Sequence, residues 1–397
     1  MEIVRGCSTK FKSLTPSILV VDGNYFTEEC ATLFPALLWL RWSIFASWWT
    51  LTCAPPSGML KNLRVLELPC AGGLQELWND TDPPLELREL NLQNANSFLK
   101  FLGSIGCLKH LKKISVDAPM TYSLVDSLPE GFCLLESLEH LQLSGFDKLT
   151  SLPREFGLLT NLRHLDLSYC SKLRMLPDSF KQLINLQYID LSGCEELTLT
   201  SENNYILENM TKFETLNFSA CKKVQNLPRD ITKQLSLRYL HAQDTGLREL
   251  PSNIGELSKL EVLEIGSYQL KTLPESMGDL SSLTSLTISC YQLKTLPESM
   301  GDLSSLTSLT ISCDQLKTLP ESMGDLSSLT SLTISHCSQL KTLPESMGDL
   351  SSLTSLTISC KELKTLPESM GDLSSLTSLT ISYCSQLKTL AESMASH

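Results

Sequence analysis

Histidine, tyrosine, aspartate and arginine recur at fixed positions through the middle of the chain, at intervals of 23 to 27 residues. The series between residues 138 and 264 contains His140, Arg163, His164, Asp166, Tyr188, Asp190, Arg238, Tyr239 and His241. Tyrosine and arginine are the residues that most often anchor protein interfaces. If the fold brings these side chains onto one face, the chemistry that they offer is the binding of a protein partner.

The same residues offer little to a catalyst. The sequence contains no G-x-x-x-x-G-K-[ST] phosphate loop, no G-x-S-x-G nucleophile motif and no H-E-x-x-H zinc motif. His140, His164 and Asp166 are metal-ligand types, but a series of mixed polar residues brings such neighbours together by chance. We therefore expect no enzymatic activity, no cofactor and no metal site.

Internal repeats must position these side chains. The string KTLPESMGDLSSLTSLTIS occurs five times without change, at steps of 23, 23, 24 and 23 residues, beginning at Lys271, Lys294, Lys317, Lys341 and Lys364. Self-similarity at a period of about 20 to 50 residues is typical of a solenoid. The period and the L-x-x-L-x-L pattern are those of a leucine-rich repeat.

Each repeat predicts one strand and one turn. Leu283, Leu286 and Ile288 are spaced three and then two apart, which predicts a short strand with one buried face. Pro297-Glu298 favours a short 3-10 turn, ended by Gly301. One unit buries too little apolar surface to offset the entropy of ordering it, so stacked units must cover each other. The sequence predicts an α/β leucine-rich-repeat solenoid: a curved right-handed coil, with a parallel β-sheet on the concave face and loops and 3-10 turns on the convex face.

The triplet continues upstream with less identity. Fourteen repeats begin at Leu63, Leu87, Leu111, Leu138, Leu162, Leu186, Phe213, Leu237, Leu260, Leu283, Leu306, Leu329, Leu353 and Leu376. Two more are plausible, at Pro16/Leu19/Val21 and Leu37/Leu40/Trp42. We divide the chain into an irregular N-terminal segment with one or two degenerate repeats (1–60), varied repeats (61–270) and near-identical repeats without a clear C-terminal cap (271–397). Leu387 and Leu390 would lie near that open end.

The composition restricts the class of partner and the cellular compartment. A net charge of −12 argues against nucleic-acid binding. Eight of the fourteen cysteines lie seven or eight residues after a triplet start, which indicates buried, reduced thiols in the cytoplasm or nucleus. The N-terminus shows no signal peptide. The apolar stretch Leu33–Ala54 contains Pro35 and Arg41, so we interpret it as a distorted repeat and expect no stable membrane insertion.

The near-identical array presents a different outward face. Thr284, Ser285, Thr287 and Ser289 recur in the copies and give a flat, uncharged surface with few anchors. We interpret the array as a spacer or curvature element, and we place the binding surface in the repeats from Leu138 to Leu260. The alternative for those repeats is a solvated face without a partner.

The sequence pattern of the repeats resembles that of one family. LRHLDLSYCSKLRMLPDSFKQLINL, at 162–186, closely resembles the repeats of plant intracellular nucleotide-binding leucine-rich-repeat (NB-LRR) disease-resistance proteins. Asp244-Thr245-Gly246-Leu247 is similar to their threonine variant, and FPALLWLRW at 34–42 looks like their first repeats. The resemblance implies a ligand-sensing and autoinhibitory role. It also implies a protein partner: a pathogen effector, a guarded host protein or a nucleotide-binding module.

The chain departs from that family in carrying no P-loop and no signalling TIR or coiled-coil module, so the resemblance implies binding without a switch of its own. An alternative is a stand-alone signalling scaffold similar to the intracellular Ras-group repeat proteins, which share the LPxxIGxLxxL wording at 250–260. A third is a non-functional fragment of a larger gene. A P-loop module encoded upstream would favour the first or third, and a stable soluble monomer would favour the second.

Overall fold

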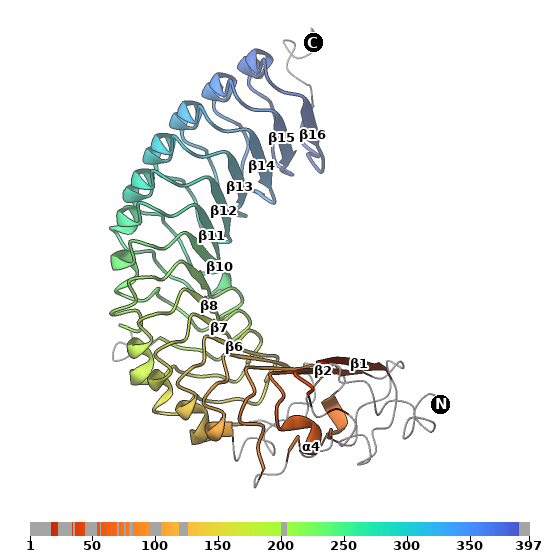
Figure 1. The fold of residues 1–397 in the computed structure, drawn as a ribbon. Coiled ribbons are helices and arrows are strands. Elements are labelled where there is room, and N and C mark those ends of the chain that lie inside the picture. Colours follow the sequence, from red (N-terminus) through yellow and green to blue (C-terminus); the bar gives the residue numbers. More distant parts are fainter. Residues whose placement is uncertain are drawn as a thin grey trace. The chain divides into compact units, whose positions relative to one another are not determined.

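A computed structural model describes residues 17–22, 34, 36–43, 54–55, 57–69, 71–74, 77–78, 82–94, 105–118, 126–199 and 205–388. The chain divides into two compact units. The first is Met1–Leu197 with Glu208–Lys212, and the second is Thr198–Leu207 with Phe213–His397. Within each unit, short parallel strands pair in sequence order and are joined by turns and 3-10 helices (Figure 1).

The first unit contains eight strands among its described residues: β1 (Ile18–Asp22), β2 (Trp39–Ser43), β3 (Val65–Leu68), β4 (Glu89–Leu92), β5 (Lys113–Asp117), β6 (His140–Ser144), β7 (His164–Asp166) and β8 (Tyr188–Asp190). Its helices are α4 (Ser57–Leu60), η1 (Ala71–Gly73), η3 (Ile105–Cys107), η4 (Glu130–Leu134), η5 (Phe156–Leu158) and η6 (Asp178–Gln182). Equivalent triplet residues lie opposite one another, as in the pair Leu141 and Leu165. The register of the sheet is therefore the register of the sequence repeat.

The second unit contains β9 (Thr215–Asn217), β10 (Tyr239–Thr245), β11 (Val262–Ser267), β12 (Ser285–Cys290), β13 (Ser308–Ser312), β14 (Ser331–Ser335), β15 (Ser355–Ser359) and β16 (Ser378–Ile381). Its 3-10 helices are η7 (Ile231–Lys233), η8 (Ile254–Glu256), η9 (Glu275–Asp279), η10 (Glu298–Asp302), η11 (Glu321–Asp325), η12 (Glu345–Asp349) and η13 (Glu368–Asp372). Figure 1 shows β10–β16 along the inner side of this unit and the short helices of the array, drawn from turquoise to blue, along its outer side.

A continuous spine of leucine fills the array. Leu286, Leu309, Leu332 and Leu356 lie opposite one another in β12–β15 and are at most 1 % exposed. Because side chains alternate across a strand, the serines and threonines between these leucines face outward. Each coil covers the apolar face of the next, as nearest-neighbour stacking requires. The predicted solenoid of parallel strands and 3-10 turns is confirmed.

The glycine of each turn has a different role from the predicted one. Gly301 lies inside η10 rather than ending it, and Pro297 precedes that helix as its N-cap. A Cβ atom on Gly301 would lie 2.4 Å from the carbonyl oxygen of Ser322 in the next turn. The glycine is therefore needed for the close approach of neighbouring turns, which the sequence of one repeat does not show.

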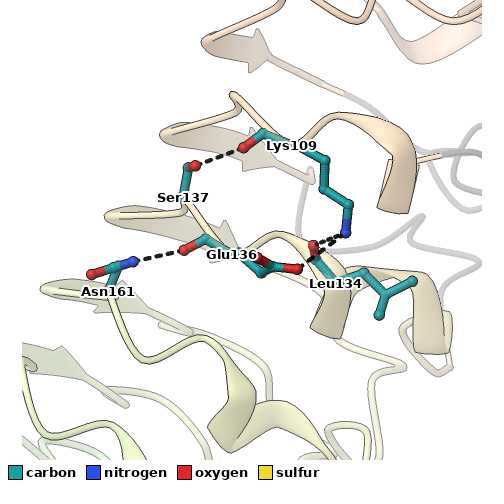
Figure 2. Close-up of polar contacts among 5 residues, drawn as sticks. All are labelled: Lys109, Leu134, Glu136, Ser137 and Asn161. Carbon is teal, nitrogen blue, oxygen red and sulfur yellow. Dashed lines mark hydrogen bonds and ion pairs between the residues drawn. The ribbon is translucent and has the colours of Figure 1, made fainter.

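Neighbouring coils are also joined by side-chain hydrogen bonds to backbone carbonyls. In Figure 2, Ser137 Oγ donates to the carbonyl of Lys109 at 2.6 Å, and Asn161 Nδ2 donates to that of Glu136 at 2.8 Å. Lys109 Nζ reaches the carbonyl of Leu134 at 2.9 Å and the Glu136 carboxylate at 3.4 Å. Each bond joins residues one coil apart, so these polar side chains reinforce the same stacking that the leucines produce.

The cysteines at the turn position point into the coil. Cys170 Sγ donates to the carbonyl of Leu143 at 3.3 Å, and Cys313 Sγ lies 3.7 Å from that of Ile288. Both thiols are fully buried. A small, weakly polar side chain thus satisfies a carbonyl of the preceding coil, as the sequence position predicts.

Some sequence predictions fall outside the described residues. These are most of Leu33–Ala54 and the chain end beyond Lys388 with Leu390. Trp42 in β2 is described, and it is fully buried. Among the described residues, no helix is long and apolar enough to cross a membrane.

Candidate protein-binding surface

Three ring side chains occupy one register of the first unit. His140 lies opposite His164, and His164 lies opposite Tyr188, on the successive strands β6, β7 and β8. Their sequence neighbours Leu141 and Leu165 are buried, so the rings face outward. The His164 and Tyr188 rings stack, with centroids 4.1 Å apart and planes 7° apart, and the His140 ring lies 5.7 Å from that of His164. We call His140, His164 and Tyr188 the ring row.

Two carboxylates lie beside the ring row. Asp166 and Asp190 are register partners at the ends of β7 and β8. The backbone N–H of Ser168 donates to Asp166 at 2.8 Å, and that of Ser192 donates to Asp190 at 2.7 Å. One oxygen of each carboxylate therefore holds the turn that follows its strand, a structural role that the sequence analysis did not anticipate.

The stacked pair of His164 and Tyr188 is uncharged at neutral pH. Burial, followed by the nearby charge of His140, lowers the pKa of His164, and the aspartates oppose this shift only in part. Burial, followed by the charge of Asp190, raises the pKa of Tyr188 to about 12. The Tyr188 hydroxyl donates to Asp190 Oδ2 at 3.2 Å, which fixes the direction of the ring. The stacked pair is thus a neutral, half-buried aromatic platform beside acidic groups.

Arg163 lies one residue before β7 and is exposed. Its positive charge acts on Glu139, whose pKa is lowered mainly by a hydrogen bond from Lys112. Lys112 Nζ lies 2.7 Å from Glu139 Oε1. The structure therefore brings six of the predicted site residues together in the first unit, with Arg163 at the border of the row: His140, Arg163, His164, Asp166, Tyr188 and Asp190.

The other three predicted residues, Arg238, Tyr239 and His241, lie in the second unit, and each contacts a glutamate there. Arg238 donates to Glu261 from Nε at 2.8 Å and from NH2 at 2.9 Å, and its guanidinium lies 5.4 Å from the centre of the Tyr239 ring. His241 Nδ1 lies 2.9 Å from Glu264 Oε2. The sequence analysis missed Glu261, although it stands one repeat of 23 residues after Arg238 with the opposite charge.

A groove in the second unit was also missed. It has a volume of about 590 Å³ and follows the carboxyl ends of the strands from β10 to β16. Its lining includes Tyr268, Tyr291, Asp314, His336, Lys361 and Tyr383, and we call it the edge groove. Tyr268, Tyr291 and Tyr383 are 64 %, 53 % and 86 % exposed. The array therefore carries aromatic anchors that its repeated string does not show.

No set of three or more His, Cys, Asp or Glu side chains in the described part of the chain could hold a metal ion. His140, His164 and Asp166 all belong to that part. What the arrangement offers is stacking, hydrogen bonding and ion pairing with a ligand.

A profile of the leucine-rich repeat region matches residues 196–339, and one of the single leucine-rich repeat matches residues 161–183. These stretches are leucine-rich repeats. No curated protein matches the sequence. Among solved structures, a leucine-rich-repeat protein of Leptospira interrogans is similar at 21 % identity with a TM-score of 0.59, over 97 % of this chain and 96 % of that one.

Two receptors share the leucine-rich-repeat fold. Toll, from a Drosophila complex of Toll with Spatzle, is 18 % identical with a TM-score of 0.56, over 93 % of this chain and 42 % of that one. A TDR receptor is 20 % identical with a TM-score of 0.55, over 93 % of this chain and 69 % of that one. At these identities the similarity establishes the fold only. A ligand has to be inferred from the surface residues of this chain.

Proposed function

We propose that the chain is a non-catalytic protein-recognition module and that the ring row is one of its contact surfaces. The observation that carries the proposal is the stacked, outward pair of His164 and Tyr188. A ring held in place by its neighbour loses little conformational freedom when a partner covers it, so its contact area contributes more fully to affinity. Asp166 and Asp190 border the row and would orient a partner through hydrogen bonds.

The charge of this surface favours a protein over a nucleic acid. A phosphate backbone is bound by clustered lysine and arginine, whereas this chain has a net charge of −12 and carries two aspartates beside the row. A protein surface with exposed backbone and basic side chains complements such a platform. The partner class is therefore a folded protein or a loop of one.

The biological setting that we propose is that of the NB-LRR disease-resistance proteins, in the cytoplasm or nucleus. The repeat sequence at 162–186 supports it. That stretch includes the ring-row residue His164 and ends two residues before Tyr188. In this setting the chain would sense a pathogen effector or a guarded host protein, or would hold a nucleotide-binding module inactive. The stand-alone scaffold remains the competing proposal.

A comparative pull-down tests the proposed function. The full chain, the double variant His164→Ala/Tyr188→Ala and the control Thr310→Ala/Thr333→Ala are each immobilised in plant-cell extract, and the retained proteins are quantified by mass spectrometry. The control replaces two outward threonines of β13 and β14. Losing two aromatic anchors should weaken a partner by about 10- to 1,000-fold.

Proteins retained by the full chain and by the control, and lost from the ring-row variant, support the proposal. Identical retention by all three proteins would refute the assignment of the ring row. Circular dichroism melts of the three proteins should agree within a few degrees, because both variants remove only outward side chains.

A further inference from the structure

The copies of the repeated string differ from one another at only a few positions, which follow the strands. Between Lys271 and Leu387 they vary at eight residues: Tyr291, Asp314, His336, Ser338, Lys361, Glu362, Tyr383 and Ser385. Six of the eight, all but Glu362 and Ser385, line the edge groove. The spine leucines, the turns and the outward threonines are the same in every copy. The residues that the fold needs are therefore repeated, and most of those that differ lie along one groove.

Solvent exposure alone does not explain this pattern. Lys294, Asp302 and Ser304 are exposed, yet the same residue stands at each equivalent position in the array. Substitutions that were merely tolerated would be scattered over all such positions. The differences instead follow the carboxyl ends of neighbouring strands, which is the arrangement expected if each strand contributes a different contact to one ligand.

Three groove residues also sit in a backbone conformation that favours glycine. Asp244, His336 and Tyr383 have φ of 52°, in the left-handed region. At the equivalent position of two repeats in the first unit, glycine occupies this conformation, at Gly145 with φ of 78° and Gly193 with φ of 74°. Asn94, Tyr169 and Ala220 adopt it at the same position, with φ of 56°, 59° and 60°, so the left-handed backbone belongs to the repeat, and glycine at this position relieves it.

The floor and the rim of the groove can both contact a ligand. The hydroxyls of Ser289, Ser312 and Ser359 line the groove and make no hydrogen bond to other described residues. Asp314 is held in place by Gln315 Nε2 at 2.7 Å and by the hydroxyl of Ser338. Tyrosine and serine together are the composition of antibody binding sites, where rigid rings supply area and small hydroxyls supply adaptable hydrogen bonds.

We propose that the edge groove binds an extended polypeptide segment that crosses the strand ends of β11–β16. Five strand spacings of about 4.8 Å give about 24 Å, the length of about seven extended residues. Asp244 and Asp314 line one half of the groove and Lys361 the other. The segment therefore carries a basic side chain in the half that faces Asp314 and an acidic side chain in the half that faces Lys361.

The inference relies on the proposed role in protein recognition but concerns a separate surface. Its residues belong to the second unit and exclude the whole ring row. The array then binds a peptide as well as acting as a spacer, and the residues that differ among its copies determine which peptide sequence it binds.

Phage-displayed random heptapeptides selected on the immobilised full chain provide the probe, followed by fluorescence-polarisation titration of the selected peptides. The groove variant is Tyr291→Ala/Tyr383→Gly, in which the glycine relieves the left-handed backbone, so that weaker binding cannot be attributed to unfolding. The matched control is Thr310→Ala/Thr333→Ala. The groove variant should weaken binding at least about tenfold, and the control should change it less than about twofold.

A charge exchange tests the orientation. With Asp314→Lys/Lys361→Asp, the selected heptapeptides should reverse the order of their basic and acidic residues. Absence of any enriched sequence, or binding unaffected by the groove variant, overturns the inference. Peptide binding that is lost in His164→Ala/Tyr188→Ala but kept in the groove variant would also overturn it, while leaving the proposed function in place. Maltoheptaose binding that depends on the same tyrosines would overturn the assignment to a polypeptide.

Discussion

The imidazole of His164 lies flat against the phenol ring of Tyr188, with 4.1 Å between their centroids, although the two residues are 24 positions apart in the chain. The contact exists because one turn of the coil returns the chain to the same register on the next strand. Each outward residue therefore has two neighbours that are set by the repeat length. Residues that share a surface on this fold are therefore one repeat length apart in the sequence.

His164 should titrate below 6.5, its ordinary pKa, because burial and the charge of His140 both disfavour the imidazolium. A lowered pKa in the folded state means that the unfolded chain binds the proton more readily. Stability is then fully present above pH 6.5 and falls as the pH drops through the folded pKa. NMR titration of the six histidines, with His164→Ala for assignment, measures the value directly.

The variant His140→Gln provides a control for that titration, because glutamine keeps a side chain of similar size beside His164. Removing the like charge should raise the pKa of His164, whereas a shift caused by burial alone would leave it unchanged. Titration of His164 at or above 6.5 in the full chain would contradict the account of a neutral platform.

Cys170 should resist alkylation in the folded protein. Burial raises the pKa of its thiol from 9.0 to about 12, and the thiolate is the reactive form. Iodoacetamide at pH 8, followed by peptide mass spectrometry, should modify the exposed Cys107 first and Cys170 only after denaturation. Equal rates at the two cysteines would show that the coil interior opens readily.

The same shift predicts a loss of stability in alkali. Above pH 9 the unfolded thiol releases its proton while the folded one keeps it, so unfolding is favoured as the pH rises toward 12. Each such thiol lowers the free energy of unfolding by about 1.4 kcal/mol per pH unit across that window. Urea titrations at pH 8 and pH 10 should therefore differ less for Cys170→Ala than for the full chain.

Deleting one whole unit, Lys294–Leu316, should be tolerated. The 23 residues removed are one coil, so β12 and β14 would pair with Leu286 opposite Leu332. A thermal melt should stay cooperative, with a midpoint within a few degrees. Deletion of Lys294–Ser305, which is half a coil, should abolish the cooperative transition; equal behaviour of the two deletions would count against the repeat register.

Gly301→Ala should destabilise the array by about 1–3 kcal/mol, because the added Cβ would meet the Ser322 carbonyl at 2.4 Å. Asp302→Ala in the same turn removes an exposed side chain and should change stability by less than about 0.5 kcal/mol. Denaturant midpoints of both variants provide the comparison. A Gly301→Ala protein as stable as the control would show that neighbouring turns are not in close contact.

The strands and the leucine spine could be predicted from the sequence because the same apolar spacing recurs in every repeat. Leu286 and Ile288 mark one strand, and the identical string marks its neighbours. The role of Gly301 could not be predicted from one repeat, because its constraint is the carbonyl of Ser322 on the next coil. The period alone does not say how closely two turns approach.

The candidate site was predicted in part. The register of His140, His164 and Tyr188 follows from the repeat, whereas their stacking depends on rotamers that no spacing determines. The pairing of Arg238 with Glu261 could have been found by comparing charges one period apart. The edge groove could not be predicted from the identical string, because its aromatic and charged residues lie outside the copies, at positions that differ from one repeat to the next.

Site-specific photo-crosslinking tests the central claim, that the outward side chains of the stacked strands contact a protein partner. Tyr188→p-benzoylphenylalanine places the reactive ring in the ring row, and Thr310→p-benzoylphenylalanine places it on an outward position of β13 as the control. After irradiation in plant-cell extract, the account predicts discrete protein adducts from position 188 and none of these from position 310. Absence of adducts at 188, or the same adducts from both positions, would contradict it.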